Sequence, residues 1–248
     1  MPSSVNKKAV RRSEPPAALV EWKGVTPAHQ ARSEATYHAL IKAGRKALAN
    51  QSFEEMTVAA LARSAGTSVG AFYGRFENKQ AYFSAIQETV VAEIAAEVRE
   101  SFEALDVAEG SAVEFLGLLA ETLAGIFRNN KGLYRAAFKD ASALPHIWTP
   151  FKRLGWAIAS MAAAKLTPRL AGLGKPASEH DVRVAIQLMN GMLVNATIND
   201  PGPIHLEDDE MVPCLKRMLF AFLGVEQAPP PRRSQAPLRR RATKKVPA

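Results

Sequence analysis

The apolar residues of this chain recur with the spacing of an α-helix from residue 31 to residue 224. Within this range apolar side chains fall three and four positions apart, and the strict alternation of a half-buried β-strand is scarce. β-Branched residues do not cluster, and no segment repeats another. The pattern therefore predicts an all-α fold without internal repeats.

Segments rich in Gly, Pro, Asn and Ser divide this range into about nine helices. Four helices, two of them very short, fit into 31–105, and the longest of these starts near Lys79 and ends near Leu105. The later helices are longer. The sequence thus predicts an N-terminal three-helix head at 31–80, joined by a long helix to a larger helical body at 81–227.

The formal net charge of +8 is concentrated at the two ends of the chain. Residues 1–30 hold five basic and two acidic residues, and residues 228–248 hold seven basic and no acidic residues. Both segments contain prolines and few bulky apolar side chains, so we expect a flexible basic arm and a disordered basic, Pro-rich tail. Such ends could be simply solvated or could contact phosphates nonspecifically. The head carries a net +3 and the body a net −5, so only the head suits DNA.

Other features of the sequence exclude several classes of protein. The single cysteine, Cys214, rules out a disulfide framework and a four-cysteine zinc site. No apolar run reaches the roughly 18 residues of a membrane span, and no apolar stretch follows the charged N-terminus as in a secretion signal. We therefore expect a cytoplasmic protein that does not bind membranes, with no metal and no cofactor.

Residues 57–76 contain the signals of two short helices joined by a tight turn. Thr57 favours the N-cap of the first helix, and Ser68 favours the N-cap of the second. Gly66 suits a turn that needs positive φ. The apolar positions that would face the core are Val58, Leu61, Ala62, Ala65, Phe72 and Phe76. A helix, a short turn with Gly and a second helix form a helix-turn-helix.

The second of these helices begins with small residues, Val69, Gly70 and Ala71. A recognition helix enters a major groove about 12 Å wide with its N-terminal end against the base edges. Bulk at that end would hold the backbone away from the bases. Gly70 otherwise costs about 1 kcal/mol relative to alanine inside a helix, so close approach to DNA would explain its presence.

Residues 32–83 resemble the DNA-binding domain of the tetracycline-repressor (TetR) family of transcriptional regulators. The matching positions are Phe53, Thr57-Val58, Ala65-Gly66, Thr67-Ser68, Tyr73-Gly74-Arg75-Phe76 and Lys79. Two positions depart from the family pattern: Ser52 stands where a glycine is common, and Arg75 replaces the usual histidine. The arginine keeps a charged donor near the backbone of the DNA.

The resemblance implies which residues of this chain would contact DNA. Thr57 would offer its hydroxyl and a helix N-terminus to a phosphate, and Tyr73, Arg75 and Lys79 would bind phosphates as well. The residues at the start of the second helix would face base edges. The full predicted set is Thr57, Thr67, Ser68, Val69, Gly70, Tyr73, Arg75 and Lys79.

The resemblance also implies a homodimer and a ligand pocket in the body. In the family the last two long helices pair with their copies in the other subunit, and here those helices would be 179–199 and 207–223. The interface residues predicted from them are Ala185, Gly191, Ala196, Leu215, Met218 and Phe222. The residues predicted to line a mainly apolar pocket for an unknown effector are Phe102, Phe115, Leu119, Phe127, Tyr134, Phe138, Trp148, Phe151, Trp156, Met189 and Met192. Each of these residues would also suit plain packing in a monomer core.

Together these features predict a sequence-specific transcriptional regulator, in the family's usual manner a repressor that leaves a palindromic operator when its ligand binds. Two alternatives remain open at this stage. The first is an architectural DNA-binding protein, held on DNA by the basic tails, that has no effector, little sequence preference and a steep salt dependence. The second is a helical enzyme, although the five histidines show no metal-ligand spacing and the glycines around 171–175 do not form a phosphate loop.

Overall fold

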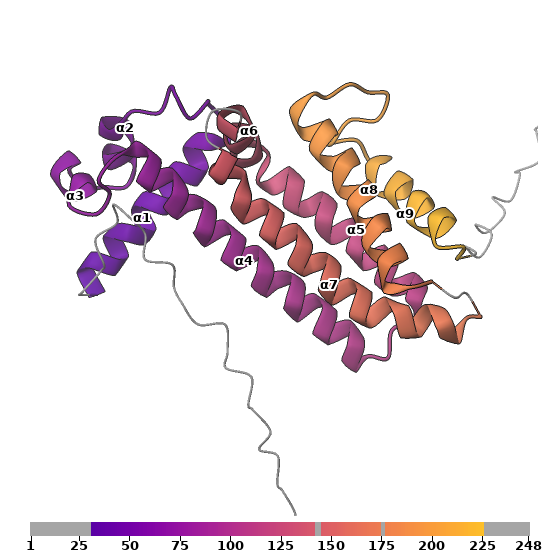
Figure 1. The fold of residues 1–248 in the computed structure, drawn as a ribbon. Helices are drawn as coiled ribbons and strands as arrows, with labels where there is room; N and C mark the ends of the chain where they lie inside the picture. Colours follow the sequence, from indigo (N-terminus) through magenta and orange to yellow (C-terminus); the bar gives the residue numbers. More distant parts are fainter. Residues whose placement is uncertain (1–30, 142–144, 175–176, 226–248) are drawn as a thin grey trace, which may run out of the picture.

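A computed structural model describes residues 31–141, 145–174 and 177–225. The described residues form nine α-helices and one short 3-10 helix and contain no strand (Figure 1). The predicted all-α fold with a three-helix head and a larger body is confirmed. The predicted basic arm and tail lie outside the described residues.

The head consists of α1 (Ala31–Leu48), α2 (Val58–Ser64) and α3 (Val69–Tyr73). Its core is a cluster of aromatic rings in which Phe72, Phe76 and Tyr82 lie with their ring centroids 5.0 to 5.2 Å apart. The Tyr82 hydroxyl donates a 2.6 Å hydrogen bond to the Leu40 carbonyl of α1. Since Tyr82 belongs to the long helix that follows, this cluster fixes the head onto the first turns of that helix.

That long helix, α4 (Lys79–Val107), runs from the head along the whole body. Asn78 caps its N-terminus by accepting a hydrogen bond from the Ala81 amide. Near its other end Asp106 binds both Lys165 and Arg169, each at 2.6 Å. This double ion pair ties the far end of α4 to the neighbouring helix.

The rest of the body contains α5 (Ala112–Asn129), α6 (Lys131–Ala141), the 3-10 helix η1 (Pro145–Trp148), α7 (Thr149–Gly172), α8 (Glu179–Ile198) and α9 (Met211–Phe222). Figure 1 shows α7 beside α4, with α8 and α9 on the side of the body away from α4. Capping boxes at Ser111 and Ser178 start α5 and α8. None of the described helices is long and apolar enough to cross a membrane.

The last helix begins at Met211, four residues later than the sequence predicted. The preceding residues form turns because other groups hold their backbone outside a helix. The Arg128 guanidinium donates to the carbonyls of Leu206 and Asp208, at 2.7 and 2.9 Å. In α9 itself, Phe220 is buried in the core.

Candidate nucleic-acid interface and cavities

The turn between α2 and α3 has the local structure that the sequence predicted. Thr57 caps α2 by accepting a 3.2 Å hydrogen bond from the Ala60 amide, and Ser68 caps α3 by accepting one of 3.0 Å from the Ala71 amide. Gly66 adopts a φ of +64°, which residues with a side chain rarely adopt. These three residues set the angle at which α3 leaves α2.

One side of α3 is anchored and the other faces solvent. Phe72 and Phe76 are fully buried, whereas Val69 and Tyr73 are 42% and 54% exposed. A Cβ added at Gly70 would meet only the Ser68 hydroxyl, at 3.7 Å, so the surface at Gly70 is open. The outer side of α3 therefore presents a small-residue surface with a phenol at its end.

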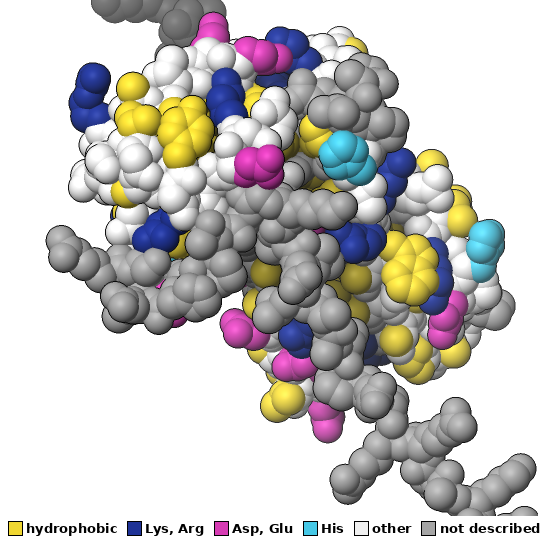
Figure 2. All heavy atoms as spheres, turned by 60° about the vertical axis from the view of Figure 1, so that its left-hand side comes forward, with side chains coloured by type: hydrophobic (Ala, Val, Ile, Leu, Met, Phe, Trp, Pro, Cys, Tyr) yellow, Lys and Arg dark blue, Asp and Glu magenta, His cyan; other side chains and the backbone are white. Residues whose placement is uncertain are grey.

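The eight residues predicted to contact DNA divide by exposure. Those that are exposed are Thr57, Ser68, Val69, Gly70 and Tyr73, and those that are partly buried are Thr67, Arg75 and Lys79. Figure 2 turns the head toward the viewer and shows basic side chains standing singly among uncharged and apolar groups, with no continuous basic patch on the coloured part of that face. The visible, described part of this face suits a few separate contacts with DNA.

Lys79 has contacts within the protein that the sequence did not predict. Its ammonium donates a 3.0 Å hydrogen bond to the Glu54 carbonyl and lies 4.6 Å from the centroid of the Phe53 ring. Lys79 therefore holds the segment before α2 against the start of α4. A cation over an aromatic face is stabilised by the ring's negative face. Its predicted phosphate contact would be a second role.

The head meets the body through the start of α6. Gly132 lies so close to the end of α1 that a Cβ there would overlap the Leu48 carbonyl. Nearby, the Lys139 ammonium of α6 pairs with the Glu54 carboxylate of the head at 2.7 Å. This hydrogen bond holds the pKa of Glu54 below its usual range. Both side chains are about half exposed or more, so salt weakens the pair.

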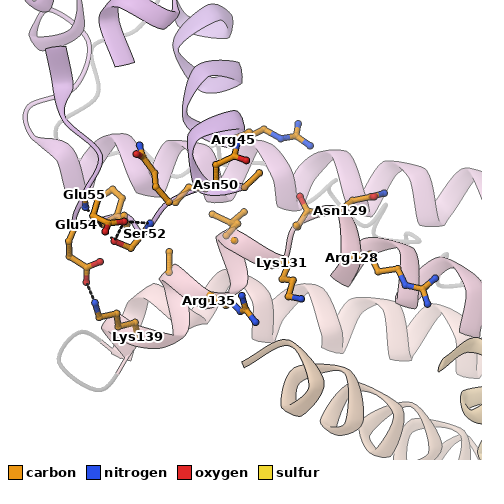
Figure 3. A pocket seen from close by; sticks show the side chains of 18 of the residues that line it. Arg45, Asn50, Ser52, Glu54, Glu55, Arg128, Asn129, Lys131, Arg135 and Lys139 are labelled. Carbon is orange, nitrogen blue, oxygen red and sulfur yellow. Dashed lines mark hydrogen bonds and ion pairs between the residues drawn. The ribbon is translucent and has the colours of Figure 1, made fainter. Parts of the chain in front are cut away.

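A cleft of about 640 Å³ lies at this junction (Figure 3). Several cations line it, and three of them bind groups of the protein itself. Arg45 pairs with Glu93, Arg135 donates to the Thr197 carbonyl, and Lys131 pairs with Glu207. These contacts indicate a structural junction.

A second cavity, of about 620 Å³, lies among α5, α6, η1, α7 and α8. We call it the aromatic cavity. Six of the eleven residues predicted for a pocket line it, namely Phe127, Tyr134, Phe138, Trp148, Phe151 and Trp156. The Phe127 and Tyr134 rings stack at 4.4 Å, and Phe151 lies 4.5 Å from Tyr134. Wide apolar walls with few polar groups are typical of small-molecule sites.

The other five predicted pocket residues lie elsewhere. Phe102, Phe115, Leu119 and Met189 are fully buried in the core, and Met192 is half-buried against it. The rings of Phe102 and Phe115 lie 4.9 Å apart, where α4 and α5 pack together. Conversely, Lys152, Arg183 and Gln187 line the aromatic cavity but were not predicted. Their placement follows from the pairing of α7 with α8, which no local sequence signal shows.

The six residues predicted for the dimer interface fall into a buried group and a group at the surface. Ala185, Ala196 and Leu215 are buried within the single chain, so they already pack inside it. Gly191, Met218 and Phe222 reach the surface of α8 and α9, and Phe222 is 45% exposed. Leu188, not predicted, is 46% exposed on the same side of α8 as Gly191.

Within the described residues, no cluster of His, Cys, Asp and Glu could hold a metal ion.

Comparisons with known proteins agree with this geometry. Residues 40–86 match the family model of the bacterial regulatory proteins of the tetR family. A Mesorhizobium loti protein described as a TetR-family transcriptional regulator shares the fold, with a TM-score of 0.64 and 17% identity, over 79% of this chain and 98% of that one. No curated protein matches the sequence significantly.

Two further solved structures have the same fold. The transcriptional regulator FadR of Bacillus subtilis, solved with stearoyl-CoA, matches with a TM-score of 0.54 and 16% identity, over 77% of this chain and all of that one (100%). The TetR-family regulator PfmR of Thermus thermophilus matches with a TM-score of 0.53 and 18% identity, over 76% and 99%.

The head thus has the structure of a helix-turn-helix DNA-binding domain, and the chain has the fold of solved transcriptional regulators. More narrowly, the resemblance to the TetR family is confirmed: residues 40–86 match the tetR-family model, and the chain has the fold of that family's regulators.

Proposed function

We propose that this chain is a transcriptional repressor that binds a palindromic operator as a homodimer and is released by a small, mainly apolar ligand. The observation that carries the proposal is the outer side of α3, where Ser68, Val69 and Gly70 are exposed on a helix anchored by buried Phe72 and Phe76. A rigid, small-residue helix end is what a major groove admits.

The proposed contacts to DNA follow from this placement. The exposed small residues at the N-terminal end of α3 lie against base edges, and the exposed Tyr73 phenol donates to a phosphate. Thr57, at the exposed N-terminus of α2, receives a second phosphate. Arg75 and Lys79, which are partly buried, contact the flanking backbone with their charged ends.

A dimer supplies the second head that a palindrome needs. Support comes from the apolar surface that α8 and α9 leave exposed, with Leu188 and Phe222 each nearly half exposed and Gly191 without any neighbour within 4 Å of a Cβ. An open glycine between apolar side chains allows a second helix to approach closely. We infer that α8 and α9 pair with their copies across a twofold axis.

Ligand release follows from the position of α6 between the two cavities. On one side Tyr134 and Phe138 line the aromatic cavity, and on the other Gly132 and Lys139 line the cleft at the head. A ligand that binds one position of α6 better than the other shifts the heads through this contact and changes their spacing. The fold is shared with FadR, which was solved with stearoyl-CoA, so a ligand with a long apolar chain has a precedent within it.

Two other functions are less well supported. An architectural DNA-binding protein needs no surface that reads bases, whereas the exposed small residues of α3 suit base edges. A helical enzyme needs converging polar and titratable groups, whereas the aromatic cavity is walled mainly by apolar side chains. We therefore propose a regulator without enzymatic activity. It would act in the cytoplasm, together with its DNA.

The test is selection of bound DNA from a random pool by the full chain. The expected product is a palindrome whose half-sites are one helical turn, or a multiple of it, apart. Enrichment of no motif would contradict a specific regulator and favour the architectural alternative.

A matched pair of glycine variants sharpens the selection. Gly70→Glu adds an acidic side chain to the open surface of α3, so it should leave the fold intact and abolish enrichment. Gly125→Glu adds the same side chain at a body position with no neighbour within 4 Å of a Cβ, and it should leave enrichment unchanged. Equal effects of the two variants would contradict the assignment of α3.

A further inference from the structure

The charged side chains that line the aromatic cavity are all basic. Two basic side chains, Lys152 of α7 and Arg183 of α8, line it, and no described lining residue is acidic. The remaining walls are aromatic and aliphatic, apart from Gln187 and Asn190. An apolar cavity with cations and without carboxylates is electrostatically suited to an anion.

Arg183 has hydrogen-bonding capacity that the described residues leave unused. Its Nε is buried and has no hydrogen-bond partner among them. One terminal nitrogen pairs with the Glu179 carboxylate in the preceding turn of α8, at a long 3.3 Å. A guanidinium carries five N–H donors, and buried donors in proteins are nearly always paired. An acceptor brought by a ligand would supply the missing partner.

The surroundings of Arg183 fix its position over an apolar surface. Its Cζ lies 5.9 Å from the centroid of the Trp156 ring, and Trp156 is 68% exposed at the cavity. A guanidinium held over an indole keeps its N–H groups in the plane, where a carboxylate binds in bidentate fashion. The cation and the apolar wall thus meet at one edge of the cavity.

A second unused donor lies among the aromatic rings. Tyr134 is only 5% exposed and lines the cavity, yet its hydroxyl makes no hydrogen bond with any described residue. Burial raises the pKa of this phenol, so it remains a neutral donor at physiological pH. Its ring is fixed by stacking on Phe127. A hydroxyl of a cavity-lining residue that has no partner among the described residues favours a ligand that brings an oxygen atom into the apolar part.

We propose that the aromatic cavity binds an amphipathic carboxylate, with an alkyl or aromatic body against the rings and its carboxylate paired with Arg183. Lys152 adds a second positive charge, and Tyr134 donates to an oxygen carried on the body of the ligand. This assignment rests on the proposed function, because it names the class of the releasing ligand.

The experiment compares three probes of equal chain length that differ in charge, using the full chain and concentrations below micelle formation. The probes are decanoate, decanol and decyltrimethylammonium, and 2-naphthoate with 2-naphthol repeats the comparison on an aromatic body. Binding is followed by calorimetry and by tryptophan fluorescence, since Trp148 and Trp156 both line the cavity. Decanoate should bind about tenfold to a hundredfold more tightly than decanol, as expected for a charge-assisted hydrogen bond. The ammonium probe should not bind.

Variants test whether Arg183 causes this preference. Arg183→Gln should remove the preference for decanoate while decanol binds as before, a result that general damage to the fold would not produce. Arg99→Gln, at an exposed position of α4 outside the cavity, should leave the preference intact. Tyr134→Phe should weaken 10-hydroxydecanoate more than decanoate.

Each outcome bears on one proposal only. Equal binding of decanoate and decanol, or no binding of any probe, would overturn the carboxylate assignment and leave the regulator proposal standing. A DNA selection without a motif would overturn the regulator and leave the cavity chemistry standing. Gly70→Glu should lose DNA binding and keep decanoate binding, which separates the two sites in one protein.

Discussion

Gly132, at the start of α6, lies against the backbone carbonyl of Leu48, at the end of α1, with no room between them for a Cβ. This contact joins the body to the DNA-binding head through backbone atoms. Backbone-to-backbone packing deforms little, so a shift of α6 must be passed on to α1. The same helix carries Tyr134 and Phe138 into the aromatic cavity.

Gly132→Ala should therefore disturb both stability and DNA binding. The added methyl group must push the two helices apart, and overpacking of this kind costs about 1–3 kcal/mol. In a protein of this size that corresponds to a fall in melting temperature of roughly 2–4 °C per kcal/mol. We also expect a changed affinity for the selected operator, because the angle between head and body changes. Thermal unfolding and a DNA-binding titration check both effects.

Gly125→Ala is the matched control for this variant. Gly125 lies inside α5 with nothing within 4 Å of a Cβ, so an added methyl group meets no neighbour. Alanine is favoured over glycine in a helix by about 1 kcal/mol, so stability should rise or stay unchanged. If Gly132→Ala also left stability and DNA affinity unchanged, the rigid contact with Leu48 would be the wrong explanation of head–body coupling.

Tyr73→Phe should weaken operator binding without changing the melting temperature. The side chain is 54% exposed, and its ring meets Phe72 edge-on at 5.4 Å, a contact that phenylalanine keeps. Only the hydroxyl is lost, and with it one proposed phosphate contact. The loss should be similar for specific and nonspecific DNA. A fall in melting temperature, or unchanged binding to both DNAs, would speak against this role.

Lys79→Ala should differ from Tyr73→Phe by affecting stability as well. The ammonium of Lys79 binds the Glu54 carbonyl and covers the Phe53 ring, so its removal frees the segment before α2. We expect a lower melting temperature together with weaker DNA binding. Lys79→Arg should keep part of both, because it retains the charge over the ring. Weaker binding with full stability would show that Lys79 acts on phosphate alone.

The local structure of the head could be predicted from the sequence because it depends on residues close together in the chain. Thr57 and Ser68 cap the helices they were expected to cap, and Gly66 has the positive φ that its turn needs. Capping and turn formation are decided within three or four residues. The long helix from Lys79 was predictable for the same reason, since its apolar stripe is continuous.

The cavity and the body surfaces could be predicted only in part, because they depend on pairing between distant helices. Phe115 and Phe127 are both apolar residues of α5, but periodicity does not show that one enters the core and the other lines a cavity. Similarly, Ala185 and Leu188 lie on one helix, and only tertiary packing buries the first and exposes the second. The contact of Gly132 with Leu48 has no sequence signal at all.

Leu188→Glu should dissociate the proposed dimer. The side chain is 46% exposed on α8, so a carboxylate is tolerated in the single chain but is costly when a copy buries it. We expect a monomer by sedimentation and weak binding to a full palindrome, with residual binding to a half-site. Val113→Glu, at a 40% exposed position in the first turn of α5, should leave the dimer intact. A dimer that persists in Leu188→Glu would place the interface elsewhere.

The turn between α8 and α9 should be sensitive to pH through His205. Its Nδ1 lies 2.8 Å from the Asp200 carboxylate, and hydrogen bonding to this carboxylate raises the pKa of His205 above 6.5. The protonated histidine therefore stabilises the turn fully below its unfolded pKa, and this contribution is lost as pH rises through the raised pKa. At the acid end, the hydrogen bond from His205 lowers the pKa of Asp200, so the pair is lost as pH falls through that lowered value.

NMR titration of His205, with hydrogen exchange of residues 200–210, should show the strongest protection between these limits. His205→Gln should remove the loss on the alkaline side, and His38→Gln, on the head, should not. A His205 pKa at or below 6.5 would contradict this account.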